Sequence, residues 1–198
     1  MNYIGDISAQ DVALLRDLAV QAEDILEFGA GGSTQVFAQA APGRASITSV
    51  ETDARWVERT LANLSLLGVA RPVDFWTWQK WERPIDRQFD LIFNDGVDKW
   101  RQEFATRAWP LLRVGGKFLY HDTRRPKDIR NVTALLNEVY LEVDSVQLNH
   151  RSSNITVLTK KAAEPWEDWN VVEKRERWEY GHDLPPAGLW EGKLKQSR

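Results

Sequence analysis

The sequence contains no cysteine among its 198 residues. Disulfide bridges, thiolate nucleophiles and cysteine-based zinc sites are therefore excluded within it. It also lacks an apolar run long enough to cross a bilayer. The first ten residues, MNYIGDISAQ, have neither the basic start nor the apolar centre of a secretory signal. We therefore expect a cytoplasmic protein with no membrane partner.

Neither acidic nor basic residues are in large excess. The formal net charge is −3, with 28% charged and 42% hydrophobic residues, which is an ordinary globular balance. One basic stretch, RRPKDIR at 124–130, is short and has no interleaved aromatic residues, so we predict no nucleic-acid partner. The length fits one domain, and nothing in the sequence indicates an oligomeric state.

What the sequence does contain is an alternation of apolar runs and amphipathic segments. A helical pattern over residues 8–22 has Ser8 as its N-cap candidate, and another runs from Pro126 to Val139. The runs typical of buried strands are DILEF, ASITSVE, PVDFWTW, QFDLIFNDG and GGKFLYHD, with helical patterns between most of them. This order predicts an α/β, doubly wound Rossmann-like sheet that is parallel over five strands. YLEVDSVQL and SSNITVLTK would close it as a hairpin with an antiparallel last strand.

The stretch DILEFGAGGSTQVFAQ, residues 24–39, places three glycines between a predicted strand and a predicted helix. A phosphate-binding P-loop would need a Lys-Ser or Lys-Thr pair after the last glycine, and none is present. A dinucleotide loop would need a third glycine where Thr34 stands, and Glu27 would point a negative charge at the pyrophosphate. A tight turn without a ligand is the structural alternative.

A second acidic residue favours a ligand. Glu51 ends the second predicted strand, twenty positions after Gly31, and a carboxylate at this spacing can accept hydrogen bonds from both ribose hydroxyls. A compound with an adenosine ribose, no phosphate and a cationic end suits Glu27, Glu51 and the glycines. S-adenosylmethionine has these groups, and its carboxylate would meet backbone N–H groups at the helix that starts near Ser33.

Four motifs carry a family resemblance. ILEFGAGGST and SVETD resemble the first two motifs of class I S-adenosylmethionine-dependent methyltransferases, whose glycine loop runs acidic-x-Gly-x-Gly. FDLIFNDG and LLRVGGKFLYHD resemble the fourth-strand and fifth-strand motifs of the same families. The resemblance spans residues 24–122 and implies their Rossmann-like fold, with S-adenosylmethionine as cofactor. The cofactor-binding residues it implies are Glu27, Gly29, Ala30, Gly31, Ser33, Thr34, Glu51, Thr52, Trp78, Gln79 and Asp95.

The resemblance also implies how the cofactor would lie. Glu27 and the glycine backbone would hold the methionine part, and Glu51 would hold the ribose. Residues 77–79 would lie beside the adenine, where Trp76, Trp78 or Trp81 is a candidate for stacking.

Polar residues follow the fourth and fifth predicted strands. Asp95 and Asp122 would meet at one rim of the sheet as oxygen ligands for Mg²⁺, which could lower the pKa of an acceptor hydroxyl. Catechol-type and macrocin-type O-methyltransferases have a similar layout, which implies Thr123 as a further ligand and, for the catechol type, Lys99 as a catalytic lysine. In the metal-free alternative His121 would be the base. The catalytic candidates are Asp95, Lys99, His121 and Asp122.

We therefore predict an enzyme that methylates a hydroxyl of a small-molecule acceptor, a sugar or a secondary metabolite. The methyltransferase domain would span residues 1–161. Residues 162–198 carry Trp166, Trp169, Trp178 and Trp190 among many charges, which predicts an extension that packs on the domain and closes over the acceptor. The alternatives are a non-catalytic binding module with the same fold and a nicotinamide-dependent oxidoreductase.

Overall fold

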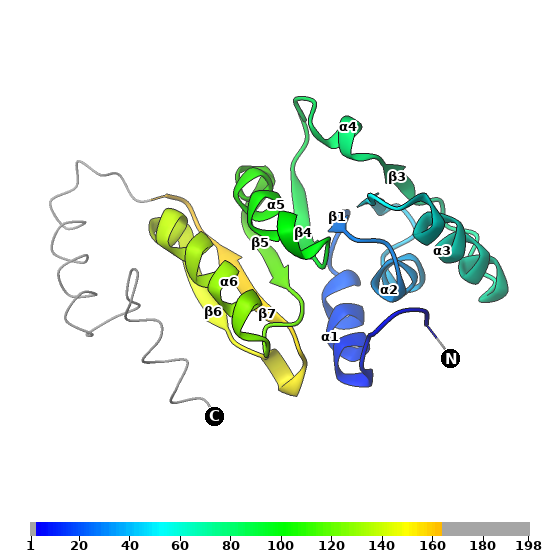
Figure 1. Cartoon of the computed structure of the whole chain (residues 1–198), viewed down its shortest axis with the longest axis horizontal. Helices are drawn as coiled ribbons and strands as arrows, with labels where there is room; N and C mark the ends of the chain where they lie inside the picture. Colours follow the sequence, from blue (N-terminus) through cyan, green and yellow to red (C-terminus); the bar gives the residue numbers. More distant parts are fainter. Residues whose placement is uncertain (1–2, 164–198) are drawn as a thin grey trace, which may run out of the picture.

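The structure is a computed structural model that describes residues 3–163 (Figure 1). The predicted boundary after residue 161 falls at the end of this range. The prediction that a Trp-rich extension packs on the domain concerns residues that lie almost wholly outside it.

One seven-stranded sheet forms the centre of the molecule, in the order β3-β2-β1-β4-β5-β7-β6. Strands β1 to β5 are parallel, and β7 runs antiparallel to both β5 and β6. The parallel sheet, the closing hairpin and the antiparallel last strand are all confirmed. The strands are β1 (Asp24–Phe28), β2 (Ser46–Val50), β3 (Asp74–Trp76), β4 (Phe89–Asn94), β5 (Leu112–Tyr120), β6 (Val143–Gln147) and β7 (Thr156–Lys160).

Strand β1 pairs with β2 on one side and with β4 on the other. The chain winds outward from β1 to β3 and then returns to the far side of β1. In open sheets of this kind, ligands bind at such a reversal, beyond the carboxyl ends of the strands.

Six α-helices connect the strands or precede them in the described range: α1 (Ala9–Ala19), α2 (Gly32–Ala40), α3 (Ala54–Leu66), α4 (Trp78–Trp81), α5 (Arg101–Ala108) and α6 (Pro126–Val139). Short 3₁₀ turns are η1 (Asp98–Trp100), η2 (Trp109–Leu111), η3 (Tyr140–Glu142) and η4 (His150–Ser152). The sequence did not predict α4. Strand β3 ends at Trp76 because Thr77 caps a helix there, its side chain accepting from the Lys80 N–H.

Local capping explains where the first helix begins. The Ser8 hydroxyl accepts from the Asp11 N–H while the Asp11 carboxylate accepts from the Ser8 N–H, which is a complete capping box. The predicted N-cap of this helix is therefore confirmed. Asp53 caps α3 in a similar way through the Arg55 N–H.

The two faces of the sheet carry separate cores, because successive strand residues point to opposite sides. Ile25 packs with Leu15 and Phe37 on the face covered by α1, α2 and α3. Leu26 packs with Phe104 on the face covered by α5 and α6 (Figure 1). Helices on both faces make this a doubly wound α/β fold, as predicted.

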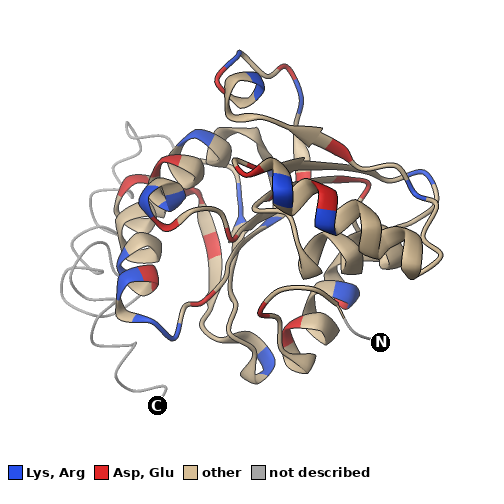
Figure 2. Ribbon diagram, turned by 45° about the vertical axis from the view of Figure 1, so that its right-hand side comes forward, with Lys and Arg blue, Asp and Glu red and all other residues tan. Residues whose placement is uncertain are grey.

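Figure 2 shows acidic and basic residues interspersed over the described ribbon. No helix among residues 3–163 is long and apolar enough to span a membrane.

Candidate functional site

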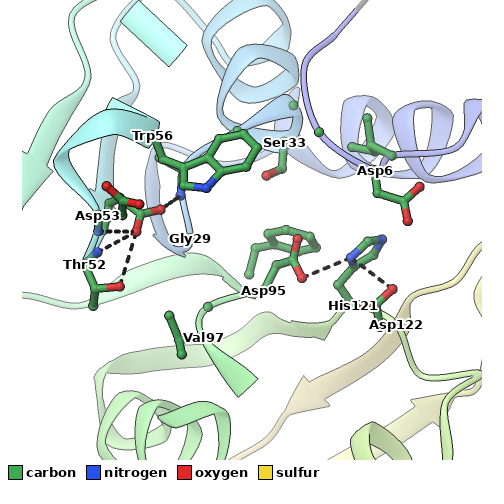
Figure 3. A pocket seen from close by; sticks show the side chains of 18 of the residues that line it. Asp6, Gly29, Ser33, Thr52, Asp53, Trp56, Asp95, Val97, His121 and Asp122 are labelled. Atoms are coloured by element: carbon green, nitrogen blue, oxygen red, sulfur yellow. Dashed lines mark hydrogen bonds and ion pairs between the residues drawn. The ribbon is translucent and has the colours of Figure 1, made fainter. Parts of the chain in front are cut away.

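A cavity of about 530 Å³ opens beyond the carboxyl ends of β1, β2, β4 and β5 (Figure 3). It lies at the reversal of the sheet, where a ligand site is expected. The predicted site residues that line it are Gly29, Ala30, Gly31, Ser33, Glu51, Thr52, Asp95, His121 and Asp122.

Gly29 brings the loop after β1 against the loop after β4. Its φ is 91°, and a Cβ added there would lie 2.6 Å from the Asp95 carbonyl oxygen. Glycine alone adopts this conformation at little cost and leaves room for the approach. The glycine therefore joins two walls of the cavity in addition to leaving space for a ligand.

Glu27 and Thr34 support the loop from beneath and do not line the cavity. The Glu27 carboxylate is fully buried and accepts from the hydroxyls of Ser33, Thr34 (2.5 Å) and Ser49 (2.8 Å). The Thr34 hydroxyl in turn accepts from the Gly31 N–H at 2.9 Å. Burial raises the pKa of Glu27 to about 7, although these hydrogen bonds act to lower it. Glu27 and Thr34 were expected to contact the cofactor directly. In the structure they instead hold the glycine loop in its conformation.

Glu51 spans the gap between β2 and the glycine loop. Its carboxylate accepts from the N–H groups of Ala30 (2.8 Å), Thr52 (2.6 Å) and Asp53 (2.8 Å). Backbone donors on both sides orient it at the mouth of the cavity, where the sequence predicted a ribose ligand.

Trp56 lines the same cavity (Figure 3), although the sequence did not predict it there. It stands three residues after Asp53, the N-cap of α3, so its ring lies in the first turn of the helix beside Glu51. The available signal was the capping residue directly after the acidic strand end. The Arg59 guanidinium covers the ring at 4.7 Å from its centroid.

The residues predicted to lie by the adenine are placed elsewhere. Trp78 packs against Trp100 (5.0 Å between ring centroids) and Phe104 (5.5 Å), and Trp81 is buried against Phe28. Gln79 is exposed, and none of the three lines the cavity. Helix α4 turns the two tryptophans inward, so the prediction for Trp78 and Gln79 is not supported by the geometry.

The wall after β4 and β5 is a cluster of charges centred on His121. The His121 Nδ1 atom lies 3.1 Å from Asp95 Oδ1 and 3.7 Å from Asp122 Oδ1, and its Nε2 atom lies 3.6 Å from Asp11 Oδ2. Burial alone would lower the pKa of His121, but Asp11, Asp95 and Asp122 raise it to about 10. His121 is therefore an imidazolium at neutral pH, which is wrong for the predicted role as a base.

Asp11 is a further residue of this cluster that the sequence did not predict. Burial would raise the pKa of Asp11, but the nearby His121 and hydrogen bonds from Ser8 and the Asn154 N–H hold this pKa well below its usual range. Its position on α1, far from β5 in the sequence, gave no motif from which this pairing could be read.

The geometry of Asp95, His121 and Asp122 raises the question of a metal, because one ligand atom from each lies within 4.8 Å of the others. A cation already occupies this place. The Arg101 side chain is 5% exposed, and its Nη2 atom lies 2.6 Å from Asp95 Oδ1 and 3.6 Å from Asp122 Oδ2. Arg125 also pairs with Asp122. A divalent ion would stand against a permanent guanidinium and an imidazolium, so these residues do not fit a magnesium site.

Thr123 and Lys99 do not join the cluster or line the cavity. The Thr123 hydroxyl is turned to Thr156 (2.9 Å) and Asn149 (3.2 Å), which removes it as a metal ligand. The Lys99 ammonium lies over the Trp100 ring at 4.9 Å and is exposed, so the expected catalytic lysine is directed elsewhere.

The segment before α1 covers one side of the cavity, which the sequence did not predict. Ile4, Gly5, Asp6 and Ile7 all line the cavity. The segment fits closely over α2, since a Cβ added at Gly32 would lie 2.5 Å from the Ile4 carbonyl oxygen. Figure 3 shows Asp6 across from His121.

A family model described as a methyltransferase domain matches residues 26–123, which include the strand ends that build the cavity. Among curated protein sequences there is no match.

Solved structures share the fold. The O-methyltransferase TomG from Streptomyces achromogenes, crystallised with SAM, is 22% identical over 79% of this chain and 82% of that chain, with a TM-score of 0.64. An O-methyltransferase from Bacillus cereus in complex with SAH is 18% identical over 78% and 83%, with a TM-score of 0.63. A methyltransferase-like protein from Silicibacter pomeroyi is 20% identical over 89% and 96%, with a TM-score of 0.60.

Proposed function

We propose that this chain is a class I S-adenosylmethionine-dependent methyltransferase, that its larger cavity binds S-adenosylmethionine and that it methylates a hydroxyl of a small molecule. The methyltransferase-domain match over residues 26–123 and the fold shared with solved O-methyltransferases support this proposal. The observation that carries this proposal is the link between Glu51 and the glycine loop. The Ala30 N–H donates to the Glu51 carboxylate at 2.8 Å. One cavity therefore brings together a carboxylate for ribose hydroxyls and a glycine backbone for the methionine part.

The other walls are consistent with the rest of the cofactor. Trp56 offers an aromatic face in the same cavity as Glu51, which suits a purine ring. The N-terminus of α2 begins at Gly32, and its free N–H groups favour a carboxylate. The relatives crystallised with SAM and SAH support this choice of cofactor.

The reaction needs placement and a route for one proton. The acceptor oxygen forms a bond to the methyl carbon while the bond from that carbon to sulfur breaks and leaves its electron pair on sulfur. Alignment of these atoms is worth roughly 7–11 kcal/mol in favourable cases. Arg101 and His121 hold Asp95 and Asp122 in fixed positions at this rim, so the carboxylates need no metal to be ordered.

Calorimetry with S-adenosylhomocysteine and with NAD tests the choice of cofactor. We expect S-adenosylhomocysteine to bind and NAD not to. The Glu51→Ala variant should lose about ten- to a hundredfold in affinity, since a charged hydrogen-bond partner contributes about 1.5–3 kcal/mol. Glu58→Ala, on the exposed side of α3, is the matched control. Equal affinities of the two variants would contradict the ribose assignment.

Transfer of a labelled methyl group to a panel of hydroxyl compounds tests the reaction. A protein that binds S-adenosylhomocysteine and yet methylates no compound would be a binding module with this fold, which is the alternative that the sequence left open.

A further inference from the structure

A second cavity of about 430 Å³ adjoins the larger one. The two cavities share three lining residues, Asp6, His121 and Asp122. Molecules that fill the two cavities would therefore both contact these three residues, which we call the shared wall. A transfer between two bound molecules requires that they lie close together.

The remaining lining of the second cavity comes from three separate segments. Ser8, Gln10 and Asp11 stand at the start of α1, Arg124 follows β5, and Ser152 and Asn154 precede β7. All of these side chains are polar or charged, and His121 is the one ring among the described residues that line this cavity. A planar aromatic acceptor would bury its rings against a mainly polar surface, which is unfavourable.

Some polar groups in this cavity already form hydrogen bonds with other residues, and others do not. Asp11 accepts from the Asn154 N–H at 2.7 Å, and Asp122 accepts from the Asn154 side-chain amide at 2.9 Å. Arg124 donates to the Ser152 carbonyl at 2.7 Å. The Gln10 side chain makes no hydrogen bond within the described range, so its amide can serve a ligand as donor and acceptor.

Asp6 differs from Asp122, the other carboxylate of the shared wall. Asp122 is paired with Arg101 and Arg125. His121 already carries its proton at neutral pH, since the pKa is raised to about 10 by its carboxylate neighbours against the effect of burial. Asp6, in contrast, has no hydrogen bond or ion pair to any described residue, is exposed, and lies across from His121 (Figure 3).

We propose that the second cavity binds the acceptor, that the acceptor is a hydroxyl-rich saturated molecule of the sugar or polyol class, and that the Asp6 carboxylate takes the hydroxyl proton. The proposal rests on the proposed function of the larger cavity. As the acceptor oxygen bonds to the methyl carbon and the carbon–sulfur bond breaks, the proton passes to an oxygen of Asp6. The products are the methyl ether, neutral S-adenosylhomocysteine and a protonated Asp6 that releases its proton to water.

An acceptor panel tests the chemical class. Methyl α-glucopyranoside and myo-inositol represent the hydroxyl-rich class, and catechol represents a planar aromatic acceptor. With the full chain and labelled S-adenosylmethionine, we expect transfer to at least one of the first two and none to catechol. Transfer to catechol, or to no hydroxyl-rich probe by a protein that binds S-adenosylhomocysteine, overturns the inference. Loss of S-adenosylhomocysteine binding in the unaltered protein would instead overturn the proposed function.

Two pairs of variants locate the acceptor and the base. Gln10→Trp places a large side chain in the second cavity, and we expect the KM for the acceptor to rise at least about tenfold. The control is Gln21→Trp, an exposed position just after the end of α1. Asp6→Asn should lower kcat by about 10²- to 10⁴-fold, with Asp86→Asn as control.

In both test variants the affinity for S-adenosylhomocysteine should stay within about twofold of that of the unaltered protein. An unchanged acceptor KM in Gln10→Trp overturns the acceptor site, and an unchanged kcat in Asp6→Asn overturns the base.

Discussion

The two walls of the larger cavity are built in different ways. The wall after β1 and β2 is held by hydrogen bonds from backbone N–H groups, as where Glu51 accepts from Ala30 and Thr52. The wall after β4 and β5 is held by ion pairs, with Arg101 between Asp95 and Asp128. Backbone donors are present whatever the side chains are. Ion pairs depend on particular residues from distant parts of the chain, so this wall should be the more easily broken.

The largest effect is expected from Arg101→Met. The Asp128 side chain is 1% exposed and would lose Arg101 and keep only the more exposed Arg125 as a partner. Removing one member of a buried pair costs about 3–5 kcal/mol. Thermal unfolding should show a lower midpoint, by roughly 2–4 °C for each kcal/mol in a domain of this size. The control is Arg55→Met, whose side chain is 85% exposed in its pair with Asp53, and we expect no measurable change from it. Equal midpoints for the two variants would refute the contrast between a buried and an exposed pair.

The next effect concerns Gly29, where the two walls touch. In Gly29→Ala the new methyl group would clash with the Asp95 carbonyl, and φ is 91°. We expect a loss of about 1–3 kcal/mol in the free energy of unfolding together with weaker S-adenosylhomocysteine binding. Gly43→Ala is the matched change, because nothing lies within 4 Å of its added Cβ, and it should stay within about 0.5 kcal/mol. Urea denaturation followed by calorimetry measures both quantities.

A smaller effect is the expected difference in pKa between His121 and His150. His121 should titrate near pH 10, because its carboxylate neighbours outweigh burial, whereas burial and nearby Arg151 lower the pKa of His150 below 6.5. Ring-proton NMR against pH measures both pKa values.

The His121 shift also predicts a pH dependence of stability. Because the folded-state pKa is the higher one, the stabilisation is fully present below about pH 6.5 and is lost as the pH rises through about 10. Urea denaturation between these values should follow that loss. A His121 resonance that titrates near pH 6.5 would contradict the ion-pair cluster and would restore His121 as a candidate base.

The smallest expected effect is that of metal. Because Arg101 stands between Asp95 and Asp122, methyl transfer should proceed at the same rate with EDTA and with added Mg²⁺. A rate that falls in EDTA and recovers with Mg²⁺ would show that the guanidinium moves aside for a metal.

The β1–β2 wall could be predicted from the sequence, because its residues are close together in the chain and carry a recognisable pattern. The glycines and Glu51 line the cavity as expected. The β4–β5 wall could be predicted only in part, since Asp95, His121 and Asp122 were expected there but Arg101 was not. Arg101 is buried by contacts that no local pattern reveals.

Helix α4 shows a second limit of sequence reasoning. The alternation in PVDFWTW favoured a strand, but a short helix cap at Thr77 redirected Trp78 into the core. For short apolar runs the two periodicities are hard to separate, so α4 was not predicted. Trp78 and Gln79, which the family resemblance implied beside the adenine, do not line the cavity, whereas Trp56 does.

The contact between Asp11 and Asn154 joins the first helix to the segment before the last described strand, 143 positions away in the chain. Both residues also line the second cavity. During translation the ribosome releases the glycine loop and Glu51 long before Asn154 emerges. A nascent chain therefore carries the β1–β2 wall of the larger cavity first and the β4–β5 wall later, and the second cavity is completed only when synthesis has nearly reached the end of the sheet.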